Sequence, residues 1–152
     1  MDSLWLYNKQ TPGPVIEANE NDIIRVEFVN NLDEPSTIHW HGIKNINKMD
    51  GVPYLTQEPV QPGETYIYEF PVKNAGTFWY HAHFQTWKQI SKGLYGPLIV
   101  KNHLDEQMHS TPIHVLDYVI AFSFQSLART CSNDRSACAE CVRRSRASPS
   151  SD

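Results

Sequence analysis

The chain has 152 residues, of which 40% are hydrophobic and 20% charged, a size and composition typical of one globular domain rather than a multidomain or solenoid protein. Its net charge of -4 argues against the basic surface with which most nucleic-acid binders attract phosphate. The sequence also lacks an apolar run of the roughly 18 to 20 residues that span a bilayer, and its N-terminal segment lacks the features of a secretory signal. We therefore expect no nucleic-acid partner, no membrane partner and no signal peptide.

Short strands separated by turn residues follow one another through the first hundred residues. Residues 22–31 show the clearest pattern, because Ile24, Val26 and Phe28 alternate with charged side chains. Only residues 85–92 lack strand character, and they are expected to form a helical turn. The expected strands are 15–16, 22–31, 37–41, 64–70, 77–83 and 94–100. This organisation predicts an all-β fold.

The character of the sequence changes after residue 100. Residues 104–125 are expected to form a linker or, within 113–125, one more buried strand. Residues 126–152 hold all three cysteines and five of the six arginines, and they lack apolar periodicity. Such a composition predicts a disordered tail rich in Ser, Arg and Cys. The folded domain is therefore expected to cover residues 1–103.

Two His-x-His patterns, formed by His39 with His41 and by His81 with His83, lie within predicted strands. Side chains at positions i and i+2 of a strand point to the same face, so each pair presents two imidazoles in one direction. If the strands are neighbours, the four rings form a rough rectangle of about 5 by 7 Å, which suits two or three metal ions better than one. The alternative interpretation is a pair of exposed or hydrogen-bonded histidines without metal.

The ligand type narrows the choice of metal. Imidazole favours copper, zinc, iron and nickel, and the absence of a neighbouring thiolate or carboxylate favours copper, the strongest binder of the divalent series. Asp50 is the nearest acidic candidate, either as a ligand or as an acid that hydrogen-bonds to a ligand. The three remaining histidines are expected at the surface: His103, His109 and His114.

Aromatic residues close to these motifs have a simple structural interpretation. We expect them to fill the core rather than to conduct electrons. They are Trp40, Tyr66, Tyr68, Phe70 and Trp79.

Longer motifs surround the histidines in a recognisable order. They are Thr-Ile-His-Trp-His-Gly at 37–42, Met-Asp-Gly-Val-Pro at 49–53, Thr-Gln at 56–57, Pro-Gly-Glu-Thr at 62–65, Gly-Thr-Phe-Trp-Tyr-His-Ala-His at 76–83 and Gly-Leu-Tyr-Gly-Pro-Leu-Ile-Val at 93–100. Over residues 4–101 this order resembles the N-terminal cupredoxin (plastocyanin-like) domain of multicopper oxidases, the laccase-like enzymes. The residues of these motifs are most similar to those of the bacterial branch of the family.

The resemblance implies a Greek-key β-sandwich and a trinuclear copper cluster that reduces dioxygen to water, with half of its eight histidine ligands in this domain. By motif position, His39 resembles a ligand of the type 2 copper, and His41 and His81 resemble ligands of one type 3 copper. His83 resembles a ligand of the other type 3 copper, and Asp50 matches the acidic residue thought to assist proton delivery. The family is mostly periplasmic or secreted.

The sequence also departs from the family pattern. Multicopper oxidases take electrons at a type 1 copper in a C-terminal cupredoxin domain, which also supplies the remaining cluster ligands. The cysteines of this chain, Cys131, Cys138 and Cys141, have no flanking histidines and match no type 1 ligand. We therefore expect a truncated or split oxidase whose partners are the missing C-terminal cupredoxin domains and dioxygen, so enzymatic activity of this chain alone stays open. The alternatives are a non-enzymatic copper-binding or storage protein, and a homo-oligomer in which a second copy completes the site.

Overall fold

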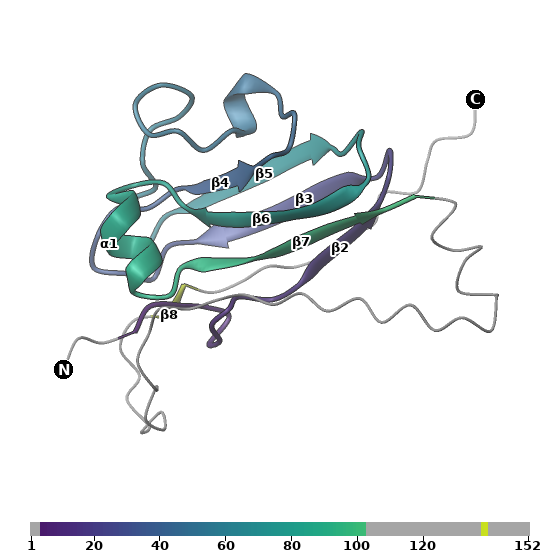
Figure 1. Ribbon diagram of the computed structural model, residues 1–152. Helices are drawn as coiled ribbons and strands as arrows, with labels where there is room; N and C mark the ends of the chain where they lie inside the picture. The colour runs from purple at the N-terminus through teal and green to yellow at the C-terminus, as the bar shows by residue number, and fades with distance from the viewer. Residues whose placement is uncertain (1–3, 103–137, 140–152) are drawn as a thin grey trace.

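The computed structural model describes residues 4–102 and 138–139, in which short strands form two facing sheets (Figure 1). In chain order the elements are β1 (Leu6–Tyr7), β2 (Ile16–Asn19), β3 (Ile23–Val29), β4 (Ile38–His41), the 3-10 turn η1 (Asn47–Met49), β5 (Thr65–Pro71), β6 (Gly76–Ala82), α1 (Thr86–Ser91), β7 (Tyr95–Lys101) and β8 (Cys138–Ala139). The predicted helical turn and five of the six predicted strands are confirmed, whereas the predicted strand 15–16 shares only Ile16 with β2 and strand β1 was not predicted. No helix within these two ranges has the length and apolar character needed to cross a bilayer.

One of the two facing sheets has four strands in the order β2-β7-β6-β4, the other consists of β3 and β5, and β1 with β8 forms a separate two-stranded sheet. Strand β2 runs parallel to β7, while the β7–β6, β6–β4 and β3–β5 pairs are antiparallel. The chain is thus an all-β Greek-key sandwich of the cupredoxin type, as predicted. The four-stranded sheet places β4 at its edge with β6 beside it, which brings the two His-x-His patterns into one sheet.

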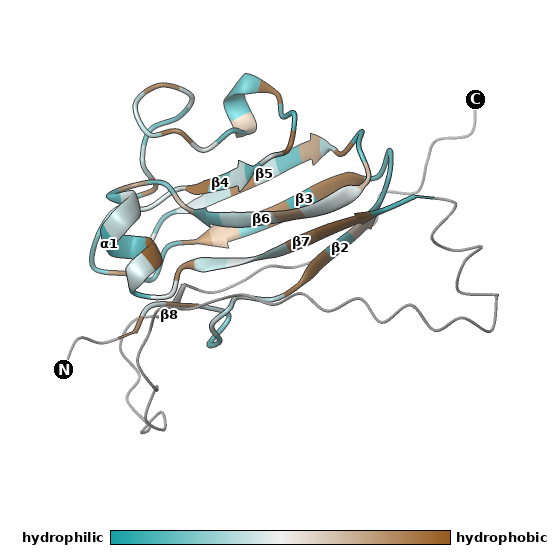
Figure 2. Cartoon of the chain, viewed as in Figure 1, coloured by the Kyte–Doolittle hydropathy of each residue, from teal (hydrophilic) through white to brown (hydrophobic). Residues whose placement is uncertain are grey.

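The core lies between the two sheets, where alternate residues of each strand are buried. Trp40 of β4 is fully buried, and its ring lies 5.5 Å from that of Tyr68 and 4.9 Å from that of Phe70, both on β5. Figure 2 shows apolar residues along β2, β7 and β3, the strands that contribute half of the aliphatic side chains of the core. Because each fully buried large apolar side chain contributes about 1.5–3 kcal/mol, this layer dominates the stability of the fold.

The prediction of core aromatics is confirmed for Trp40, Tyr68 and Phe70, whereas Tyr66 is only partly buried against the core. For Trp79 it is wrong. This side chain is 38% exposed, because it lies on the outer face of β6, opposite the face that carries the buried Tyr80.

Little of the chain after residue 102 can be compared with prediction. Residues 138–139 lie in the segment predicted to be disordered, and they form strand β8, which pairs in parallel with β1. The other residues of the predicted tail 126–152, the predicted linker or strand 104–125, and the three histidines expected at the surface, His103, His109 and His114, lie outside the described residues.

The connection from β4 to β5 folds back against β4. Gly51 makes the closest approach, since a Cβ atom built on it would lie only 1.8 Å from the carbonyl oxygen of Ile38. Its φ of +74° is also one that favours glycine. The neighbouring turn η1 is held to β5, where the hydroxyl of Tyr66 donates to the Lys48 carbonyl at 2.9 Å. Asp50 is thereby fixed beside the first His-x-His pattern.

Candidate metal centre

The pairing of β4 with β6 determines which histidines meet. His39 lies directly opposite His81, and His41 lies opposite Trp79. On both strands the alternate residues, such as Trp40 and Tyr80, are buried in the core. The histidines therefore stand on the outer face of the sheet, and the expectation that the two patterns lie on neighbouring strands is confirmed.

The four rings form a staggered group around His39. Its ring centroid lies 5.7 Å from that of His41, 5.4 Å from that of His81 and 5.1 Å from that of His83. The predicted rectangle is wrong in shape, because antiparallel pairing sets only His39 and His81 opposite each other. The other two histidines extend from this central pair in opposite directions along the sheet.

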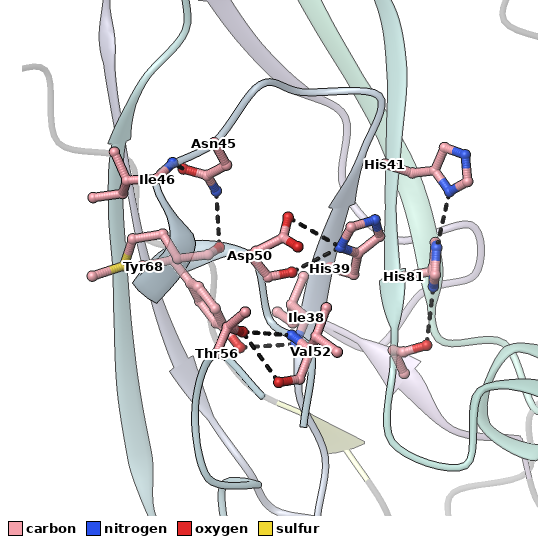
Figure 3. Close-up of polar contacts among 12 residues, drawn as sticks. Ile38, His39, His41, Asn45, Ile46, Asp50, Val52, Thr56, Tyr68 and His81 are labelled. Atoms are coloured by element: carbon pink, nitrogen blue, oxygen red, sulfur yellow. Dashed lines mark hydrogen bonds and ion pairs between the residues drawn. The ribbon is translucent and has the colours of Figure 1, made fainter. Parts of the chain in front are cut away.

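Three of the histidines form the tightest group. One ring nitrogen from each of His39, His41 and His81 lies within 4.8 Å of the others. Nδ1 of His41 and Nε2 of His81 are 3.4 Å apart (Figure 3). This spacing approaches the separation of about 3.3 Å expected between ligand atoms of a four-coordinate ion with bonds of ~2.0 Å. Within the described residues this is the group whose geometry suits a metal ion.

Main-chain carbonyls determine which ring nitrogens remain available. The Nδ1 atom of His39 lies 2.7 Å from the carbonyl oxygen of Asp50, and Nδ1 of His81 lies 3.0 Å from that of Ala82. A carbonyl oxygen only accepts hydrogen bonds, so each Nδ1 carries the proton and each Nε2 keeps its lone pair for a metal. His41 differs, since its Nδ1 is the nitrogen directed at His81.

His83 lies just beyond the end of β6, where its main-chain N–H donates to the Thr37 carbonyl at 3.1 Å. Its ring is near His39, but it is not part of the tight group of three. Its Nδ1 is buried and has no hydrogen-bond partner among the described residues. A buried nitrogen in this condition loses favourable hydration without compensation, a loss that a ligand such as a metal ion can offset.

Asp50 lies behind His39, at the ring nitrogen that is already hydrogen-bonded. Its carboxylate Oδ1 is 3.5 Å from Nδ1 of His39, farther than its own carbonyl oxygen (Figure 3). Of the two roles left open for this residue, the position favours an acid that contacts a ligand over a direct ligand of the ion held by Nε2 of His39. The carbonyl contact was not predicted, because sequence patterns identify side chains and this bond uses the main chain.

Trp79 is the second feature that the sequence interpretation missed. Its ring stacks on that of His41, with centroids 5.0 Å apart and planes inclined by 29°. It also lies over His81, at 4.2 Å and 35°. The signal was present in the sequence, since Trp79 precedes His81 by two residues and must share its face of the strand.

Comparisons with known proteins agree with this arrangement. Residues 1–105 match the family model described as multicopper oxidase. The chain belongs to the multicopper oxidase family. Dihydrogeodin oxidase of Aspergillus terreus is 48% identical over 99 residues, which cover 62% of this chain and 16% of that protein. Laccase-1 of Cryptococcus neoformans var. grubii is 44% identical over 100 residues, which cover 64% of this chain and 16% of the laccase.

A solved structure shows the same relationship. The multi-copper oxidase from Pseudomonas thermotolerans is 52% identical, with a TM-score of 0.60, and the match covers 61% of this chain and 23% of that structure. The chain thus corresponds to the N-terminal domain of a multicopper oxidase and spans about one sixth of the length of these curated relatives. The similar proteins include fungal and bacterial oxidases, and the closer resemblance to the bacterial branch stays a prediction. Family membership favours the oxidase-domain hypothesis over copper storage and self-assembly.

The electrostatics of this oxidase domain suit a metal cation. Burial, reinforced by the neighbouring histidines, lowers the pKa of His81 to about 4. Burial likewise lowers the pKa of His83 below its ordinary value. Both rings are therefore neutral at pH 7, the form that coordinates metal. A set of ligands made entirely of imidazoles fits copper, the cofactor that membership of this family implies.

Proposed function

We propose that this domain supplies His39, His41, His81 and His83 as half of the ligands of a trinuclear copper cluster in a dioxygen-reducing oxidase. The observation that carries the proposal is the pairing of His39 with His81, which gathers three imidazole nitrogens within 4.8 Å on one open sheet face. Copper, when bound, would accept electrons and pass them to dioxygen. The protein residues hold the ligand atoms in place and prepare their protonation states.

We assign the individual histidines by their motif positions in the family. His39 is proposed as a ligand of the type 2 copper, His41 and His81 as ligands of one type 3 copper, and His83 as a ligand of the other. Two observations support this division: Nδ1 of His41 and Nε2 of His81 lie 3.4 Å apart, and His83 stands apart from the tight group of three. The remaining ligands and the type 1 copper are proposed to come from C-terminal cupredoxin domains of the complete oxidase.

Asp50 is proposed to assist proton delivery to the cluster during oxygen reduction. Its side chain is 33% exposed, so the carboxylate can exchange protons with solvent. The same carboxylate lies 3.5 Å from Nδ1 of His39, which connects it to the candidate ligands. Because the Asp50 carbonyl rather than its carboxylate makes the shorter contact, an Asp50→Asn substitution is expected to leave His39 oriented.

Copper titration of the full chain tests the proposal. Isothermal calorimetry with Cu²⁺ is expected to show binding at micromolar metal, which His39→Ala and His81→Ala each weaken by about ten-fold or more through loss of a ligand. His109→Ala is the control, since it removes a histidine outside both His-x-His patterns. Failure of the wild-type chain to bind copper at micromolar concentrations, or equal weakening by His109→Ala, would contradict the proposal.

A further inference from the structure

Trp79 is unusual among the aromatic residues of this sandwich because it packs on the site rather than in the core. The core aromatics of β4 and β5, Trp40, Tyr68 and Phe70, are fully buried, whereas Trp79 is 38% exposed. Its closest ring neighbours are the imidazoles of His41, on the adjacent strand, and of His81, two residues along its own strand. One indole ring therefore contacts both members of a candidate ligand pair.

The two histidines differ in what else restrains them. His81 is buried, and its Nδ1 is hydrogen-bonded to the carbonyl of Ala82. His41 is exposed, and its ring is held on one side by the 3.4 Å contact with Nε2 of His81 and on another by Trp79. An exposed histidine without such a neighbour would sample several rotamers, and metal binding would have to select one of them.

We propose that Trp79 is a positioning residue of the copper site, which fixes the rings of His41 and His81 so that Nδ1 of one and Nε2 of the other face a common point. The inference rests on the proposed function and adds to it the residue that orients one ligand pair. Stacking restricts His41 before metal arrives, so less conformational freedom is lost on binding. The indole face also favours an imidazole that becomes more positive when a metal coordinates it.

Two substitutions distinguish the effect of a flat aromatic ring from the effect of side-chain volume. Trp79→Leu removes the stacking surface, and we expect it to weaken Cu²⁺ binding by the full chain about ten-fold, the size of one aromatic pair contact. Trp79→Phe keeps a flat ring and is expected to stay within about three-fold of the wild type. The control is Trp87→Leu on α1, because Trp87 is 86% exposed and its ring does not contact the four histidines.

A measurement on the copper-free chain tests positioning independently of metal binding. The ring protons of His41 in NMR spectra are expected to carry the shift caused by the indole face, to keep part of it in Trp79→Phe and to lose it in Trp79→Leu. Circular dichroism establishes that each variant is folded. If Trp79→Leu does not fold, Trp79→Met replaces it as the variant without a flat ring.

Three results would overturn the inference: a folded Trp79→Leu (or Trp79→Met) chain that binds copper like the wild type, a Trp79→Phe chain as weak as Trp79→Leu, or unchanged His41 signals in the variant without a flat ring. A wild-type chain that binds no copper contradicts the proposed function instead. The NMR comparison still decides in that case whether Trp79 orients the two histidines.

Discussion

At the scale of single residues, the candidate site depends on which ring nitrogen of each imidazole is already hydrogen-bonded. Two main-chain carbonyls fix the protons of His39 and His81 on Nδ1, and burial keeps His81 neutral. The four histidines were predictable, because their i, i+2 spacing in strands needs no knowledge of the fold. The carbonyl of Asp50 was not, because it reaches His39 only after the β4–β5 connection has folded back.

The lowered pKa of His81 predicts that the copper-free chain loses stability in mild acid. Its folded-state pKa of about 4 lies below the ordinary value of 6.5, so between these values the unfolded chain binds the proton more readily. Stability is then fully present above about pH 6.5 and falls as the pH approaches 4. Urea unfolding above and within this window measures the effect. His81→Gln should show a smaller loss, and an equal loss would rule out His81 as its source.

At the scale of elements, strands and helical turn were predictable because alternation of apolar and polar residues is a local property. The register between β4 and β6 was not predictable, because the 34 residues between His41 and Gly76 form a long connection that carries no pairing signal. Gly51 and Gln89 both contact the chain at or just before the start of β4. A substitution at either residue tests how much its contact contributes to stability.

Gly51→Ala is expected to destabilise the domain severely, because the added methyl would collide with the Ile38 carbonyl on β4. We expect a cost of about 3 kcal/mol or more in the free energy of unfolding. Gly63→Ala is the matched control, since Gly63 has a similar φ of +81° but nothing within 4 Å of the added atom. It should cost about 1–2 kcal/mol, from backbone strain alone. Equal costs in urea unfolding would show that the approach to β4 is unimportant.

Gln89 ties α1 to the residues that precede β4. Its fully buried side chain accepts from Ser36 Oγ at 2.8 Å and donates to the Pro35 carbonyl at 2.9 Å. Gln89→Leu leaves both partners unsatisfied, so we expect it to lower the free energy of unfolding by about 2 kcal/mol. The exposed Gln61 provides the control, and Gln61→Leu should change the free energy of unfolding by less than about 0.5 kcal/mol. A thermal or urea melt that ranks the two variants equally would contradict this role.

At the scale of the whole molecule, the histidines lie on the side of the four-stranded sheet that faces away from β3 and β5. His41 is exposed, and in residues 4–102 no other cluster of His, Cys, Asp and Glu has metal-binding spacing. The sandwich and its family could be predicted from the motifs. The expectations for residues 103–137 and 140–152 stay predictions, because these residues lie outside the part of the chain that the structure describes.

Under the proposed function, the copper-loaded chain alone is expected to show no measurable turnover of a phenolic substrate, because Cys131, Cys138 and Cys141 have no flanking histidines that match a type 1 copper site. Oxygen consumption measured with an electrode tests this expectation. The complete multi-copper oxidase from Pseudomonas thermotolerans, which aligns with this chain at 52% identity, is a suitable positive control. Steady oxygen uptake by the chain, abolished by His81→Ala, would show that the domain is an oxidase on its own.

The pairing of His39 with His81 has one more consequence. A shift of a β-strand by a single position exchanges its two faces, so a misfolded copy with β4 displaced by one residue would turn its imidazoles inward and Trp40 outward. Such a copy would present indole to water and leave only His81 and His83 on the outer face, so it would bind copper more weakly. The strength of copper binding would therefore distinguish correctly folded molecules from misaligned ones without any assay of catalysis.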